Sequence, residues 1–417
     1  MRIIVAAWLF AFMHAFADQG SLSPSPRTNI NPALLYSQAI QVMPDRSEQD
    51  HLFTNEWRGR ELDERFNQQI ATYDNSFNLL RLAARQKVPC DWGYDLSQGP
   101  ELLLPSLAKA KSLTQAARLR IRWHLENGRP DDARDDFLAA FVLGRQVSRD
   151  GILISALVQF AIENILVSSL AENWFRLGPE TLQQIMDGIE AAPARGAIVQ
   201  CIETERVSFK DWLARKIREF QSDSTDESEA LQKTRQLLHS VMDQSEDPSK
   251  KTNSPTPESV IQAAGGTTAG LLQQLKELDP LYEEAAVLMT VPYQQFLPLI
   301  QAFNEKLKKH PNQLVKDFFP AFEKCRIKEF AVEVKLAMLR AAFEYRQAGD
   351  GAFAQILDPT LQAPFHLRRF EFDGTDRGFE VSSKMRYPDD WNASLIFIEK
   401  DGPAFYLDGK NAGKPVK

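Results

Sequence analysis

Glu163 is the side chain whose position most suggests chemistry, because it lies in the middle of an apolar run, residues 152–167. It shares one helical face with Ser155 and Gln159, since residues four positions apart stand above one another on a helix. A buried carboxylate without a partner has a raised pKa and can act as an acid catalyst. The interpretation that we favour is an ion pair with an arginine of a neighbouring helix.

Arg118 and Arg122 are the arginines that we expect to supply this partner, because they share one face of the preceding helical segment. His124 follows on the same segment, beside Trp123. None of the histidines after residue 17 lies within four positions of another, so the histidine pair of a helical zinc site is missing. We interpret His124 as a packed or capping residue rather than a metal ligand.

The loop that leads into these helices holds a second group with binding chemistry, Asp91 next to Trp92. The face of a tryptophan with a nearby carboxylate suits contacts with a sugar or a cation. The alternative is that Trp92 is buried and anchors the loop against the ends of the adjacent helices. We favour this second interpretation.

Sequence motifs for catalysis and cofactor binding are missing. There is no G-x-S-x-G, no H-E-x-x-H and no EF-hand loop. The glycine-rich segment 263–270 lacks the Gly-Lys-Ser/Thr ending of a phosphate loop and the G-x-G-x-x-G order of a dinucleotide site. We therefore predict no cofactor, no nucleotide and no metal.

The cysteines Cys90, Cys201 and Cys325 are far apart in the sequence and form no C-x-x-C pair. We favour buried free thiols that pack as small apolar side chains. One disulfide between two of them is the alternative, and the sequence does not choose the pair.

Three consecutive helices, from Leu102 to Trp174, must position most of these residues. Apolar residues recur at steps of three and four, and the first helix ends at Gly128-Arg129-Pro130. A glycine after one helix and a proline in the first turn of the next are typical of such a break. With so short a loop the first two helices pack antiparallel. The third is apolar on nearly every side, and Glu163 and Asn164 within it favour a central core helix over a membrane span.

The turn from Leu125 to Ala133, between the first two helices, resembles that of tetratricopeptide-type helical hairpins. The resemblance covers residues 102–149, and no second copy follows at the period of about 34 residues that such repeats keep. It implies an irregular array of antiparallel helical hairpins.

Residues 1–17 have the three parts of a secretory signal peptide: Arg2, an apolar segment from residue 3 to residue 13, and an Ala-Phe-Ala cleavage site. No later run is typical of a stop-transfer segment, so we expect an exported protein, periplasmic or extracellular, without a transmembrane segment after cleavage. The net charge of −7 includes no run of five or six like charges. This pattern argues against a nucleic-acid partner.

Composition and periodicity divide the rest of the chain into blocks. The Ser-rich and Pro-rich residues 18–31 form a flexible lead-in, and residues 222–262 form a polar linker with a weak helix. The remaining blocks are an N-terminal helical domain at 32–221, a second helical block at 263–350 and a small β element at 351–417. Alternating residues between Phe365 and Glu399 predict three or four antiparallel strands, which must pack on the preceding long helix.

The order of a long helix with Glu-Tyr-Arg-Gln, a loop with Asp358-Pro359 and a strand with Gly-Phe-Glu-Val-Ser-Ser resembles the C-terminal part of uncharacterised exported bacterial helical proteins. It is distantly similar to the layout of type II secretion pseudopilins, over about residues 330–410. The glycine-containing turn, the calcium-type tail and the N-terminal pilin helix of pseudopilins are absent. The resemblance therefore implies a helix-plus-sheet layout and no pilus assembly.

These patterns predict a mainly α fold, an irregular array of antiparallel helical hairpins with a small C-terminal antiparallel β-sheet. The function that we expect is a non-catalytic scaffold or binding module of the bacterial envelope, with another envelope protein or a peptide as its partner. The alternative is an envelope hydrolase that acts on polysaccharide or peptidoglycan through carboxylates. Two carboxylates about 5 to 10 Å apart in a cleft would favour the enzyme. Paired carboxylates and a groove lined by aromatic residues and arginine would favour binding.

Overall fold

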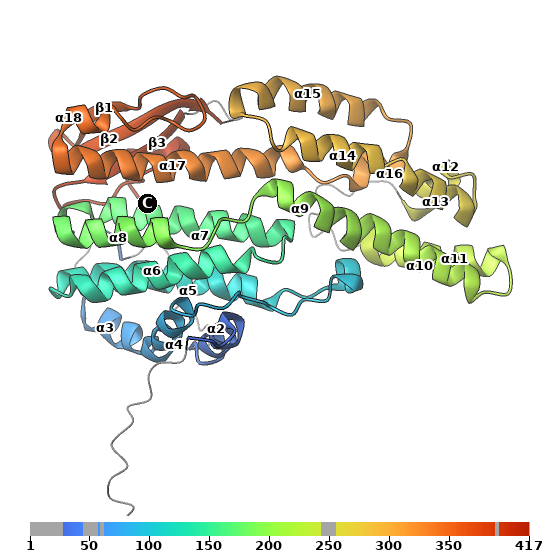
Figure 1. The fold of residues 1–417 in the computed structure, drawn as a ribbon, viewed down its shortest axis with the longest axis horizontal. Helices are drawn as coiled ribbons and strands as arrows, with labels where there is room; N and C mark the ends of the chain where they lie inside the picture. The colour runs from blue at the N-terminus through green and yellow to red at the C-terminus, as the bar shows by residue number, and fades with distance from the viewer. Residues whose placement is uncertain (1–27, 45–56, 59–61, 243–255, 388–391, 417) are drawn as a thin grey trace, which may run out of the picture.

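A computed structural model describes residues 28–44, 57–58, 62–242, 256–387 and 392–416. The predicted signal peptide and most of the lead-in lie outside these residues. The described chain is mainly helical with a three-stranded antiparallel sheet near its C-terminal end, which confirms the predicted mainly α class with a small β-sheet. The array of tetratricopeptide-like hairpins stays a prediction. Figure 1 shows the helices in stacked layers, with α2 to α4 at one face and α17 and the sheet at the other.

The first layer consists of α2 (Pro32–Gln41), α3 (Glu64–Ala71) and α4 (Asp74–Ala84). The sequence pattern predicts one helix from residue 63 to residue 87, and this is wrong, because the chain breaks between α3 and α4. The hydroxyl of Thr72 donates a hydrogen bond back to the Gln69 carbonyl at 2.6 Å. Such a side chain competes with the helical backbone bonds and favours a break at this point.

The central layers are α5 (Pro105–Glu126), α6 (Pro130–Val147), α7 (Leu153–Glu172) and α8 (Pro179–Ala191). The first three match the predicted core helices, and α5, α6 and α8 each begin with a proline in the first turn. Gly128, after α5, has a φ of +67°, the left-handed conformation that glycine takes at a helix C-terminus. The α5–α6 pair is therefore closed by its own local sequence.

A pair of antiparallel helical segments extends beyond these layers toward the right of Figure 1. The first segment is continuous and consists of α9 (Ile198–Glu205), a π-helical turn (Arg206–Asp211) and α10 (Trp212–Ser222). The second segment is α11 (Glu227–Met242), which packs against α10. The sequence pattern predicts one regular helix over residues 197–220, and the structure differs by inserting the π-turn. A π-turn shifts the faces of the helix that follows it, so α9 and α10 pack against different neighbours.

Shorter helices cover the end of this pair and lead to the long helix α17 (Phe322–Ala348). They are α12 (Pro257–Ala263), α13 (Thr268–Lys276), α14 (Asp279–Leu288), α15 (Tyr293–Lys309) and α16 (Gln313–Phe318). The apolar pattern predicts one helix over residues 271–290, whereas the structure divides this segment into α13 and α14. Pro280 lies in the first turn of α14, where its missing N–H removes no helical hydrogen bond.

The sheet follows the short α18 (Asp350–Phe353) and contains β1 (His366–Phe372), β2 (Thr375–Arg386) and β3 (Asn392–Ile398) in the order 1-2-3. Asp373 and Gly374 between β1 and β2 both have positive φ, as the tight turn of a β-hairpin requires. The sheet packs on α17 as predicted, and β3 also contacts α7. Short helical turns lie at Leu96–Glu101, Trp174–Arg176 and Gly409–Asn411.

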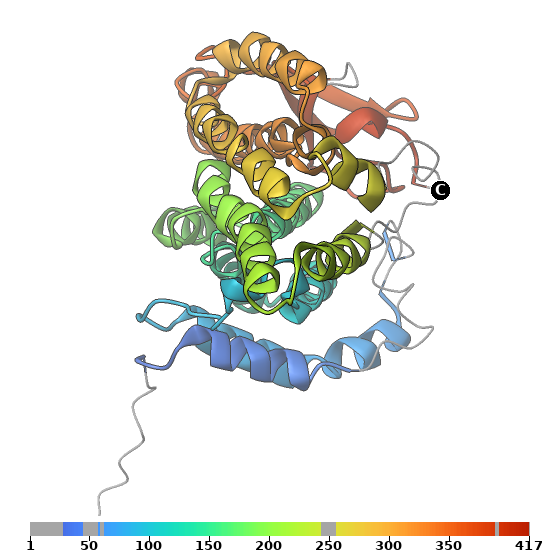
Figure 2. The same ribbon diagram turned by 90° about the vertical axis from the view of Figure 1, so that its right-hand side faces the viewer.

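Helix α7 is the one helix of the described residues that is long and apolar enough to cross a membrane. It packs against α5, α6, α9, α17 and β3, and more than half of its apolar segment is buried. Figure 2 shows the green part of the chain, to which α7 belongs, between the blue N-terminal helices and the orange C-terminal part. Within the fold, α7 therefore takes the place of a central core helix, as its all-round apolar pattern predicts.

Candidate functional site

Glu163 lies fully buried on α7, and its ion-pair partners differ from the predicted ones. Its carboxylate faces Arg145 at 2.6 Å and Arg195 at 3.2 Å, and it accepts a hydrogen bond from Gln159 at 3.1 Å. The prediction of an ion pair is confirmed, but the predicted partners on α5 are wrong, because α6 and the segment after α8 cover this side of α7. Burial raises the pKa of Glu163 despite the two arginines.

Arg118 instead pairs with Glu172, the last residue of α7. Glu172 accepts hydrogen bonds from Arg118 Nη2 at 2.8 Å and from Arg58 Nε at 2.8 Å. Burial alone would raise the pKa of Glu172, but the charges of Arg118 and Arg58 outweigh it and lower that pKa to about 2. This group is a structural ion pair that joins α5, α7 and the segment at residue 58.

Arg122 and His124 belong to two further buried ion-pair groups. Arg122 donates to Glu126 at 2.7 Å and to the carbonyl of Trp57 at 3.1 Å. His124 Nε2 lies 3.2 Å from the carboxylate of Asp136, which also accepts a hydrogen bond from Arg120 at 2.9 Å.

Asp136 of this group is fully buried, which alone would raise its pKa. The hydrogen bond from His124 and the charges of Arg120 and Arg81 hold the pKa of Asp136 below its usual range. His124 is therefore a packed residue in an ion-pair network, as predicted. Over the described ranges, no group of three histidine, cysteine or acidic side chains is placed to hold a metal ion.

Trp92 anchors its loop, which is the interpretation that the sequence favours. Its indole N–H donates to the carbonyl of Gln146 at the end of α6, at 2.9 Å. The ring stacks between Tyr36 and Tyr94, with centroid distances of 5.9 and 6.3 Å. Asp91 is exposed and accepts a hydrogen bond from the backbone of the glycine two residues on, so it shapes the turn.

Cys90, Cys201 and Cys325 are buried free thiols, as the favoured interpretation predicts. Burial raises the pKa of all three thiols, that of Cys90 to about 12. None of them is therefore activated as a thiolate nucleophile.

The residues singled out from the sequence are thus spread over several structural ion-pair groups and do not form one site. A pocket of about 350 Å³ between α4, α6 and α8 is the better candidate. Its walls are mostly apolar and are formed by Ala84, Leu138, Ala139, Val142, Gly188, Ala191, Ala192 and Pro193. Its polar lining residues are Arg81, Arg85, Gln86, Asp135 and Gln146.

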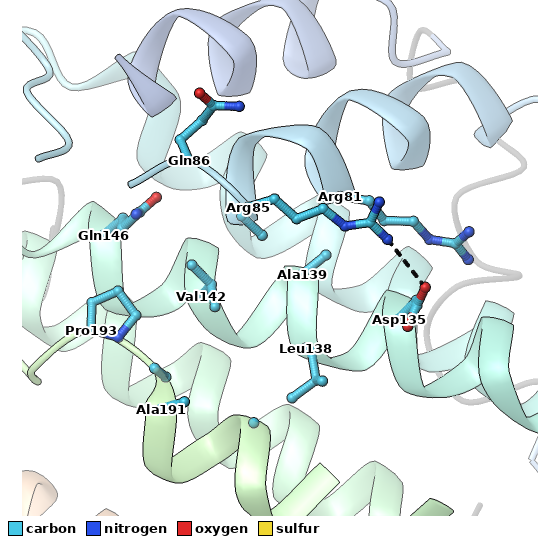
Figure 3. A pocket seen from close by; sticks show the side chains of 13 residues that line it. Arg81, Arg85, Gln86, Asp135, Leu138, Ala139, Val142, Gln146, Ala191 and Pro193 are labelled. Atoms are coloured by element: carbon cyan, nitrogen blue, oxygen red, sulfur yellow. Dashed lines mark hydrogen bonds and ion pairs between the residues drawn. The ribbon is translucent and has the colours of Figure 1, made fainter. Parts of the chain in front are cut away.

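Charged side chains gather at one end of this pocket (Figure 3). Arg81 is held in place, because it pairs with buried Asp136 at 2.7 Å and with Asp132 at 3.3 Å. Arg85 is less constrained, since its side chain is 68% exposed and its ion pair with Asp135, the one it forms within the described residues, has a distance of 3.4 Å. This end of the pocket therefore presents one fixed and one adjustable guanidinium group.

Gln146 lies at the opposite end of the pocket, next to Gln86 (Figure 3). Gln146 is 5% exposed, and its Oε1 has no hydrogen-bond partner among the described residues. Gln86 differs, because its Oε1 accepts a hydrogen bond from the backbone of Ile30 at 3.0 Å. A buried acceptor without a donor costs about 1 to 3 kcal/mol, so its presence in a pocket calls for a reason.

The width of the pocket depends on a close approach of α6 and α8. A Cβ atom added at Gly188 on α8 would lie 2.4 Å from the end of the Leu138 side chain on α6. The absence of a side chain at residue 188 gives Leu138 the room to lie along the pocket wall.

Two carboxylates that accept hydrogen bonds from the start of α7 stand apart from the ion-pair groups: Asp150, just before α7, and Glu205, the last residue of α9. Asp150 accepts hydrogen bonds from the backbone of Ile152 at 2.9 Å and from Ser155 at 3.1 Å, and Glu205 accepts one from the backbone of Leu153 at 3.3 Å. Burial raises the pKa of Asp150 to about 6 and also raises that of Glu205. Neither has a cationic partner within the part of the chain that the structure describes.

Sequence reasoning missed Arg81, Arg85, Gln146 and Asp150. The arginines are four positions apart on one helix, and the start of α6 is rich in aspartate, so charge complementarity between the two segments was a usable signal. Gln146 interrupts the apolar stripe of α6 next to Val147, which marks it as a polar residue on a buried face. No comparable signal existed for Asp150, because its lack of a cationic partner results from the packing of distant segments.

Comparison with known proteins found no matching family model, no similar curated protein and no similar solved structure.

Proposed function

We propose that this protein is an exported, non-catalytic binding module of the bacterial envelope, and that it holds a protein or peptide partner in the pocket between α4, α6 and α8. The observation that carries this proposal is the composition of the pocket, apolar walls with a guanidinium group and an unpaired amide oxygen at opposite ends. Pockets of this kind are typical of ligand sites, in which a few polar groups orient an apolar ligand.

The paired carboxylates support binding over catalysis. Asp136, Glu163 and Glu172 are buried acidic groups of the helical layers, and each faces two arginines. Asp135, the acidic residue of the pocket, pairs with Arg134 at 2.8 Å as well as with Arg85. The charged groups that line or surround the pocket therefore maintain its shape, and the pocket offers no pair of unpaired carboxylates for hydrolysis.

Site-specific photocrosslinking tests the proposal. A photoreactive phenylalanine replaces Val142 in the pocket wall in one protein and Val287, 65% exposed on α14, in a control. Both proteins are irradiated in the envelope of the producing cell. A discrete crosslinked species from residue 142, identified by mass spectrometry and absent from residue 287, is the expected result. Equal labelling from both positions, or none from residue 142, contradicts the proposal.

The second candidate function, an envelope hydrolase that acts on polysaccharide or peptidoglycan, has one observation in its favour. Asp150 and Glu205 are half-buried beside the start of α7, and their raised pKa values suit a general acid. Their hydrogen bonds to the first turn of α7 also explain them as helix caps. Release of soluble fragments from purified peptidoglycan, lost in Asp150→Asn, would favour the hydrolase over the binding module.

A further inference from the structure

The pocket between α4, α6 and α8 favours a ligand with polar groups as well as an apolar part. Its two polar ends are complementary to different groups of such a ligand. Arg81 and Arg85 carry positive charge and lie at one end, whereas Gln146 offers a neutral hydrogen-bond acceptor at the other. A ligand that satisfies both ends has an anionic group and an N–H or O–H donor, joined through an apolar body.

Arg85 is the cation that can turn to a ligand without leaving a buried charge behind. Its ion pair with Asp135 is long and exposed, and such pairs contribute about 0 to 1 kcal/mol. Asp135 keeps a second partner, since Arg134 donates to it through both Nε and Nη2 at 2.9 and 2.8 Å. Figure 3 shows the Arg85 side chain extending above Ala139 toward Asp135, with which it forms this ion pair. A carboxylate in the pocket would exchange a weak surface pair for a bidentate one.

Gln146 limits the choice of ligand further. Its Oε1 is buried and lacks a donor, so a ligand gains the most when it brings an N–H into the pocket. A simple fatty acid or a phosphate ion would leave this acceptor unsatisfied. A peptide bond supplies the missing donor.

We propose that the pocket binds the C-terminal end of a peptide whose last residue is apolar. The terminal carboxylate pairs with Arg85, the last peptide N–H donates to Gln146 Oε1, and the last side chain packs on Leu138 and Val142. A volume of about 350 Å³ is at the lower end of the range for ligand pockets, and it matches about one or two residues rather than a long segment. This inference rests on the proposed binding function and names the chemistry of its partner.

Three related peptides test the inference by isothermal titration calorimetry with the mature protein. They are acetyl-Gly-Ala-Leu with a free carboxylate, the same peptide with a C-terminal amide, and the acid with a methyl group on its last peptide nitrogen. We expect the amide and the N-methyl peptide each to bind about tenfold or more weakly than the acid, since each loses one of the two polar contacts. Equal binding of the acid and the amide, or no binding of the acid at millimolar concentration, overturns the inference.

Matched variants assign the two contacts to their residues. Arg85→Gln should abolish the preference for the acid over the amide, whereas Arg65→Gln, at an arginine that is 72% exposed and paired with Asp63, should preserve it. Gln146→Leu should abolish the penalty of the N-methyl group and keep the preference for the acid. Circular dichroism and thermal unfolding confirm that each variant folds. A preference for the acid that persists in Arg85→Gln contradicts the assignment.

The outcomes separate this inference from the proposed function. Crosslinking from residue 142 together with equal binding of acid and amide peptides leaves the binding module in place and removes the C-terminal specificity. Absence of both crosslinking and peptide binding removes both.

Discussion

The middle and the C-terminal end of helix α7 carry the same kind of ion-pair group with opposite electrostatic results. Glu163 and Glu172 are both buried, and each faces two arginines. Burial raises the pKa of Glu163, whereas the pKa of Glu172 is lowered to about 2, because Arg118 and Arg58 outweigh its burial. The number of cationic neighbours therefore does not decide which effect is larger.

The two groups also differ in the geometry of their hydrogen bonds. Glu172 accepts hydrogen bonds from Arg58 Nε and from both Nε and Nη2 of Arg118. At Glu163 the oxygen Oε2 and the Nε atoms of Arg145 and Arg195 form no hydrogen bond, although the charges are close. Charge alone only partly replaces the water that a buried carboxylate loses, and oriented N–H donors replace the rest. A carboxylate among arginines can thus be either firmly ionised or poorly solvated.

The largest effect that we predict is at Glu172. Glu172→Gln should lower the free energy of unfolding at pH 7 by on the order of 3 kcal/mol, because a pKa lowered to about 2 means that folding strongly favours the ionised form. Glu163→Gln is the matched control and should change stability little, since its raised pKa means that folding favours the neutral form. Urea denaturation of both variants measures the difference. Equal losses of unfolding free energy in the two variants would contradict the contrast drawn between Glu163 and Glu172.

The second prediction concerns how the free energy of unfolding changes as the pH is lowered. The stabilisation from Glu172 is present above pH 4.5 and should be lost as pH falls from about 4.5 to about 2. Glu163 acts in the opposite direction, because its folded-state pKa is raised: its contribution is present below pH 4.5 and is lost as pH rises through that folded-state pKa. The wild-type protein should therefore lose more stability between pH 5 and pH 3 than Glu172→Gln does. Parallel denaturation curves for the two proteins would show that Glu172 is not the source.

Asp150 extends the comparison to a carboxylate without any arginine partner among the described residues. Asp150→Asn should raise the free energy of unfolding at pH 8 by about 1 kcal/mol, because the ionised form is disfavoured in the folded state and the amide can keep the caps on α7. The gain should disappear as pH falls through about 6 toward 3.8, where the wild-type residue becomes protonated. Thermal unfolding at pH 8 and pH 4 measures both values. A loss of stability at pH 8 would mean that the caps matter more than the charge.

Gln146 extends the comparison of buried polar groups from carboxylates to a neutral amide. Gln146→Leu should leave stability unchanged or raise it by about 1 kcal/mol, since it removes a buried acceptor that lacks a donor. Gln86→Leu is the control and should be destabilising, because the Oε1 of Gln86 accepts the N–H of Ile30. Thermal unfolding compares the two. A strong loss in Gln146→Leu would show that the amide has a structural role.

The fold was predictable where local sequence decides it. Helices α5 to α7 follow from apolar periodicity, a glycine at position 128 and prolines at helix starts, and the β-hairpin follows from alternation around Asp373-Gly374. The breaks within two predicted helices and the π-turn after α9 were missed. They change the direction of a helix without changing its composition, so periodicity does not detect them.

The site was predictable only in part, because its partners come from distant segments. The sequence singled out Glu163 as buried and Trp92 as an anchor, and both predictions are confirmed. The arginines that reach Glu163 lie on α6 and after α8, and the choice between them and Arg118 depends on how the layers stack. The pocket itself has no sequence motif, since it results from the spacing of three helices.

The close approach of α6 and α8 at Gly188 and Leu138 determines how a substitution could change the size of the pocket. A side chain at position 188 would press on the end of Leu138, which lines the pocket, so we expect the apolar wall to shift and the polar lining residues to stay as they are. Gly188→Ala would thus alter which side-chain sizes fit while leaving the charged end and Gln146 as they are. In the proposed site, size selectivity and polar recognition would therefore be separable, and a different residue would change each of them.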